Sequence, residues 1–103
     1  MAYTVLLVDD SETIRALLTD FLHSIRKAEA EMTRALASQT WDQVRRSAHS
    51  VAGAARTAGS HNLAEVASAI ERAVVAGRQE ALGELPQRVA TEIQRLEDHI
   101  ALI

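Results

Sequence analysis

A histidine with small residues beside it is the feature of this sequence that most suggests chemistry. His49 is followed at three and four residues by Ala52 and Gly53, which share its surface patch if the segment is helical. A glycine inside a helix costs about 1 kcal/mol relative to alanine, so Gly53 indicates a close approach by another molecule. These small neighbours leave the imidazole of His49 without a bulky side chain on that side.

Arginines flank this histidine on the same predicted helix. A neutral imidazole is a nucleophile, and guanidinium groups attract the oxygens of an anionic phosphoryl donor. We therefore interpret His49 as a candidate phospho-acceptor. The residues predicted to line a docking surface around it are Arg45, Arg46, Ala52, Gly53 and Arg56. The alternative is a surface helix that contains a histidine and several arginines with no further role.

Four apolar stripes supply the scaffold for this site. Each recurs at intervals of three and four residues, as a helix with one buried face requires. They run from Ile14 to Leu36, from Trp41 to Ala58, from Leu63 to Val74 and from Leu82 to Ile103. Short links between them predict an all-α fold, an antiparallel up-down-up-down four-helix bundle with a short N-terminal extension.

Local signals mark where these helices begin and end. Thr40 and Gln43 match a capping box at the start of the second helix. Glycine is favoured just past a helix end, and proline is favoured in the first turn. The residues that predict an end, a bend or a late start are Gly59, Gly77, Gly83 and Pro86.

Composition narrows the class of protein. A chain of 103 residues is long enough for one domain, and its low aromatic content of 3% suits close-packed helices. The absence of cysteine excludes disulfides and thiolate chemistry, and a net charge of −3 argues against general nucleic-acid binding. No metal-ligand spacing, phosphate loop, membrane-spanning run or signal peptide is apparent, so we expect a cytoplasmic protein that binds no metal or membrane.

The segment from Ala48 to Gly59 resembles the histidine phosphotransfer (HPt) family, and the resemblance spans roughly residues 14–103. The family pattern is H-x-x-K-G-x-x-x-x-x-G, followed by a leucine and a glutamate. The matching residues are His49, Gly53, Gly59, Leu63 and Glu71. The family lysine three residues after the histidine faces the acidic receiver site, and Ala52 stands at its position here. Arg56 or Arg45 is a candidate to replace its charge.

The resemblance implies a phosphoryl carrier of a two-component phosphorelay. His49 would accept a phosphoryl group from a receiver aspartate or a kinase and pass it to another receiver aspartate. The chain would have no ATP-dependent kinase activity of its own and no cofactor, because magnesium is expected on the receiver partner. Docking is expected on the exposed side of the first and second helices around His49.

The first residues resemble a different family. Residues 1–11 contain V-L-L-V-D-D-S, which is similar to the opening strand of a receiver domain with its paired carboxylates, Asp9 and Asp10. The chain lacks the later strands of a receiver, so this magnesium site is incomplete. We divide the chain into a receiver-like segment, residues 1–11, and an HPt-like bundle, residues 12–103. A strand at Thr4–Val8 would pair with a second copy or fold onto the bundle, which leaves monomer and dimer open.

One alternative function remains open at this point. A non-catalytic helical module that binds a receiver, or that dimerises through the N-terminal segment, has the same helical pattern. The substitution of the family lysine by Ala52 keeps that alternative in view. Transfer of label from a phosphorylated receiver distinguishes the two functions.

Overall fold

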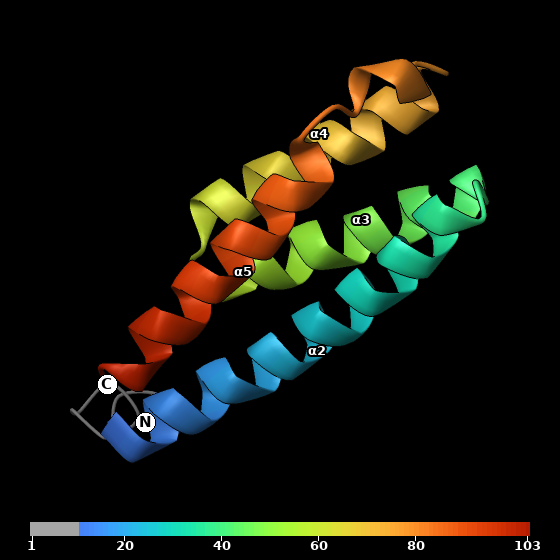
Figure 1. The fold of residues 1–103 in the computed structure, drawn as a ribbon. Helices are drawn as coiled ribbons and strands as arrows, with labels where there is room; N and C mark the ends of the chain where they lie inside the picture. Colours follow the sequence, from blue (N-terminus) through green and yellow to red (C-terminus); the bar gives the residue numbers. More distant parts are fainter. Residues whose placement is uncertain (1–10) are drawn as a thin grey trace.

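A computed structural model describes residues 11–103 and contains four α-helices in that range. They are α2 (Ser11–Ala37), α3 (Trp41–Thr57), α4 (His61–Val75) and α5 (Leu85–Ala101), with a 3-10 helix η1 (Gln79–Ala81) before the last. Successive helices run in opposite directions, and α5 ends beside the start of α2 (Figure 1). The predicted all-α, up-down-up-down bundle is confirmed. Of the receiver-like segment, residues 1–10 lie outside the described residues, and Ser11 begins α2.

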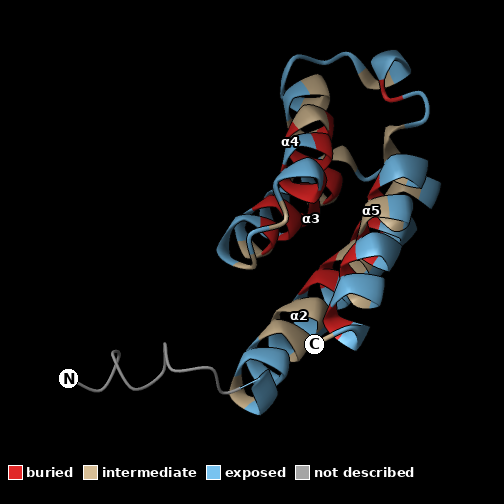
Figure 2. Ribbon diagram, turned by 90° about the vertical axis from the view of Figure 1, so that its left-hand side faces the viewer, coloured by how far each residue is buried: buried red, intermediate tan, exposed pale blue. Residues whose placement is uncertain are grey.

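The core lies along α3, which packs against both α2 and α4, while α5 closes the bundle against α4 and α2. Buried positions face inward from Val44 to Ala55 of α3 and from Leu63 to Ile70 of α4 (Figure 2). The largest side chains with almost no exposure are Ile25, Met32, Leu63, Ile70, Ile93, Val44, Val51 and Val89. Ala48 and Ala55 of α3 are completely buried among them, and these small side chains let neighbouring helices approach closely.

Three helix ends share one backbone motif. Gly59 and Gly77 follow α3 and α4 with φ angles of +80° and +70°, as the sequence predicts. Gln39 follows α2 in the same conformation, with φ +54°. Around it, the amide of Thr40 donates to the carbonyl of Ala35 at 2.9 Å, which is the long bond of a Schellman motif. Gln39 therefore takes, after α2, the left-handed conformation that Gly59 and Gly77 take after α3 and α4.

The capping box predicted for the second helix is wrong. Thr40 makes no side-chain bond to the first turn of α3, and its hydroxyl pairs instead with that of Ser38 at 2.9 Å. Gln43 donates from Nε2 to the hydroxyl of Ser47 at 2.9 Å. Ser47 is only 2% exposed, and a buried hydroxyl needs a hydrogen-bond partner. The Gln43 side chain therefore bonds to Ser47 instead of capping the start of α3.

The link from α4 to α5 confirms the late start of the last helix. Gly83 has φ +47°, and Pro86 lies in the first turn of α5, where its missing N–H costs nothing. Leu82, expected on the last helical stripe, is buried but precedes the helix. The 3-10 turn η1 was not predicted, because a segment of three residues is too short to show hydrophobic periodicity.

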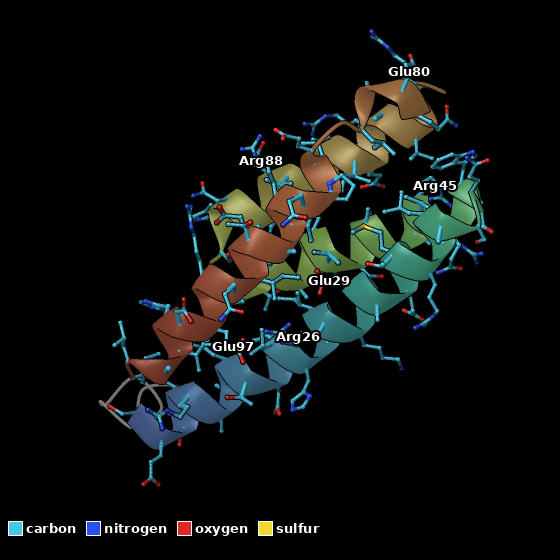
Figure 3. All side chains as sticks on the ribbon, viewed as in Figure 1. Arg26, Glu29, Arg45, Glu80, Arg88 and Glu97 are labelled. Atoms are coloured by element: carbon cyan, nitrogen blue, oxygen red, sulfur yellow. The ribbon has the colours of Figure 1, made fainter. Side chains whose placement is uncertain are left out.

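The first apolar stripe is only partly buried. Ile14 is 40% exposed and Leu17 52% exposed, whereas Ile25 is fully buried. At about 1.5 Å per residue, α2 is roughly 40 Å long and α3 roughly 25 Å, so α2 extends past its neighbour. Arg26 of α2 and Glu97 of α5 form an ion pair where these two helices still lie together (Figure 3). Within residues 11–103, no helix combines the length and hydropathy needed to cross a bilayer.

Candidate functional site

His49 lies on the outer side of α3 and is oriented by a carboxylate from α4. Its side chain is 71% exposed, and its Nδ1 lies 3.1 Å and 3.2 Å from the two carboxylate oxygens of Glu71. An ionised carboxylate only accepts hydrogen bonds, so Nδ1 carries the hydrogen. In the neutral ring, Nε2 then holds the lone pair. The contact therefore fixes both the ring orientation and the nitrogen that is nucleophilic.

Gly53 follows one turn after His49 and is exposed. A Cβ built on this residue meets no heavy atom within 4 Å, so nothing inside the described part of the chain requires a glycine there. Its backbone is ordinary α-helix as well. The absence of an internal reason agrees with the prediction that Gly53 leaves room for another molecule beside the imidazole.

Ala52 requires a correction. It is 1% exposed and belongs to the hydrophobic core, so it is not a contact residue of a docking surface. Three residues turn a helix by 300°, which places Ala52 about 60° from His49 on the core side. Because α3 packs between α2 and α4, its buried face is wider than that of a helix packed on one side only. The sequence-based assignment of Ala52 to the exposed row overlooked this width.

Arg45 and Arg46 share one carboxylate in the first turn of α3. Nη2 and Nε of Arg45 donate to Oδ1 of Asp42 at 3.0 Å and 3.2 Å, and Nε of Arg46 lies 3.3 Å from Oδ2. Arg45 is at the end of α3 nearest the link to α2 (Figure 3). Asp42 precedes both arginines, whereas His49 follows them. Their guanidinium groups are therefore held toward the start of the helix, away from His49.

Arg56 lies near the other end of α3 and bridges to α4. Its Nη2 donates to the hydroxyl of Ser68 at 2.8 Å, and Ser68 itself is 6% exposed. Ser68 precedes Glu71 by three residues, so both face the same side of α4. Two polar contacts, His49 to Glu71 and Arg56 to Ser68, thus connect the exposed margin of α3 to α4.

Sequence reasoning missed the contribution of α4 to this site. It placed the docking surface on the first two helices, but the polar partners of His49 and Arg56 come from α4. The sequence indicates Glu71 only as part of a family pattern, and it gives no prediction for Ser68, although a serine within an apolar stripe is a usable signal. Among residues 11–103, no group of His, Cys, Asp or Glu side chains is arranged to hold a metal ion.

An exposed imidazole that a carboxylate holds on a rigid helical pair is suited to accept a phosphoryl group from another protein. Comparison with protein families agrees with a phosphoryl-accepting protein: the family model described as "Hpt domain" matches residues 16–99. The chain belongs to the Hpt domain family, whose role is histidine phosphotransfer in phosphorelays with receiver domains and kinases. No curated protein and no solved structure matched the chain.

Proposed function

We propose that His49 is the phospho-acceptor of a phosphorelay carrier, which takes a phosphoryl group from a receiver aspartate or a kinase and delivers it to a receiver aspartate. The observation that carries this proposal is the contact between Nδ1 of His49 and the carboxylate of Glu71. It leaves the opposite ring nitrogen as the nucleophile on a side chain that is mostly exposed.

The chemical step follows from this arrangement. Nε2 attacks the phosphorus atom of an aspartyl phosphate, the P–O bond to the aspartate breaks, and the aspartate leaves as a carboxylate. As the N–P bond forms, the ring that keeps its hydrogen on Nδ1 becomes positively charged. The Glu71 carboxylate, 3.1 Å from Nδ1, stabilises that charge. Delivery to the next receiver is the reverse step.

Positioning is the main contribution of this chain. The imidazole is held on the outer side of α3 by the Glu71 carboxylate of α4, and the surface beside it is open at Gly53. Magnesium on the receiver partner would supply the charge that the transferring phosphoryl group needs. Holding the nucleophile at a fixed place lowers the entropic cost of bringing it in line with that group.

The test uses His49→Gln. We expect the variant to keep the fold, since surface substitutions usually change stability by less than about 0.5 kcal/mol, and to take no label from a phosphorylated receiver. Matched controls are His23→Gln, His61→Gln and His99→Gln, each of which should label like the parent. The bound phosphate should be acid-labile and base-stable, as expected for a phosphoramidate.

Two results would contradict this assignment. Label on the His49→Gln variant would show that another residue accepts the phosphoryl group. A parent chain that binds a phosphorylated receiver but takes no label would support the alternative of a non-catalytic interaction module.

A further inference from the structure

The three arginines of α3 differ in how their charge is compensated. Arg45 and Arg46 both pair with Asp42. Arg56 instead donates to a neutral hydroxyl, that of Ser68, and forms no ion pair among residues 11–103. Only one of its nitrogens is used in that bond, whereas a guanidinium carries five N–H groups. Arg56 therefore keeps both its charge and unused donors.

Arg56 also stands on the face of α3 that carries the imidazole. Seven residues advance a helix by about 10.5 Å and return within about 20° of the same direction. Side chains lean toward the N-terminus of their helix, which for Arg56 is the direction of His49. Gly53 lies between the two, and nothing inside the described chain stands over its Cβ position. The result is an open strip of α3 with the imidazole at one end and a cation at the other.

The contact with Ser68 restricts the conformational freedom of the Arg56 side chain. Ser68 is 6% exposed on a packed helix, so its hydroxyl is a fixed point to which one arm of the guanidinium is bound at 2.8 Å. A long side chain held before binding loses less rotamer freedom when a partner arrives. The opposing charge is Glu71, whose carboxylate beside the imidazole repels an incoming phosphoryl group and the acidic residues around it.

We infer that Arg56 is the docking cation of this site and recognises the anionic, phosphoryl-bearing surface of a partner receiver domain. This inference rests on the proposed function of His49. Arg56 acts on association rather than on the bond-forming step, because its helical position separates it from the imidazole by two turns. Its effect should therefore appear in the second-order rate constant and in KM, and should be screened by salt.

The experiment measures transfer from an acetyl-phosphate-loaded receiver to Arg56→Gln at about 50 mM and about 300 mM salt. We expect kcat/KM to fall about three- to tenfold at low salt, with kcat nearly unchanged and a weaker dependence on salt than in the parent. Arg56→Lys keeps the charge and should recover most of the loss. Arg15→Gln is the matched control, because it removes the same charge from the exposed first turns of α2.

The outcomes separate this inference from the proposed function. A parent chain that takes no label at His49 refutes the proposed function itself. If the parent takes label and Arg56→Gln matches it at both salt concentrations, or falls no further than Arg15→Gln, the inference is wrong. A loss confined to kcat, with parental salt dependence, also contradicts it. If Arg56→Gln melts below the assay temperature, Ser68→Ala and Arg56→Lys provide the test. Arg56→Lys should keep the parental salt dependence of transfer. Ser68→Ala should raise KM.

Discussion

Replacing Glu71 by glutamine tests how the carboxylate acts on His49. The amide oxygen of glutamine still accepts the hydrogen on Nδ1, so the ring keeps its orientation while the negative charge is lost. Hydrogen bonds to a charged group contribute about 1.5–3 kcal/mol, against about 0.5–1.5 kcal/mol between neutral groups. Because His49 is 71% exposed, the small end of that difference applies, about 1 kcal/mol. This corresponds to a roughly fivefold slower transfer.

The assay is single-turnover transfer from a saturating phosphorylated receiver, with Glu71→Ala beside Glu71→Gln. Alanine removes both charge and orientation, so we expect a larger loss than for glutamine. Nitrogen NMR of the imidazole supplies an independent measure: the Nδ1–H form should dominate in the parent and in Glu71→Gln, and should lose population in Glu71→Ala. If Glu71→Gln transfers at the parental rate, the carboxylate does not stabilise charge on the ring. If Glu71→Ala keeps the parental tautomer, the 3.1 Å contact does not control it.

Four further changes test the bundle itself. Gln39→Gly should raise the free energy of unfolding by about 0.5–1 kcal/mol, because glycine adopts the left-handed conformation without strain. Gly77→Ala should lower the free energy of unfolding by about 1 kcal/mol for the same reason. Denaturant titration measures both, and a change of the same sign in the two variants would contradict the shared motif. Ala55→Leu should cost about 1–3 kcal/mol by overpacking a fully buried position, and an unchanged melting temperature would show that the position is not buried. Ala52→Lys should also destabilise, by about 1–3 kcal/mol, because its stem must enter the core; a melt equal to the parent's would show that the stem escapes to solvent.

The four helices could be predicted because each repeats one apolar face over several turns. The ends at Gly59 and Gly77 were also readable, since a left-handed residue after a helix favours glycine. The end at Gln39 carries no such signal, although the backbone there is the same. The break between the first two helices was predicted at residues 38–40, and α2 does end at Ala37. The left-handed backbone conformation at a helix end, however, could be predicted only where glycine marks it.

The site was predicted less completely, because it depends on contacts between helices. The position of His49 on the margin of α3 follows from that helix alone. The burial of Ala52 depends on how wide a face α3 buries between two neighbours, and the role of Glu71 depends on the antiparallel register of α3 and α4. The periodicity of one helix gives neither the width of its buried face nor its register against a neighbouring helix. A family pattern pointed to Glu71 without the physical reason, which the structure supplies.

The uneven burial of α2 has a consequence for its dynamics. Its second half is held by Ile25, Ala28 and Met32 in the core, while Ile14 and Leu17 near its start are 40% and 52% exposed. Helical segments of about ten residues without tertiary packing are marginal in water. Amide hydrogen exchange along this one helix should therefore slow by orders of magnitude from its first turns to its last, so that opening of the first turns does not require the phospho-acceptor helix pair, α3 and α4, to open.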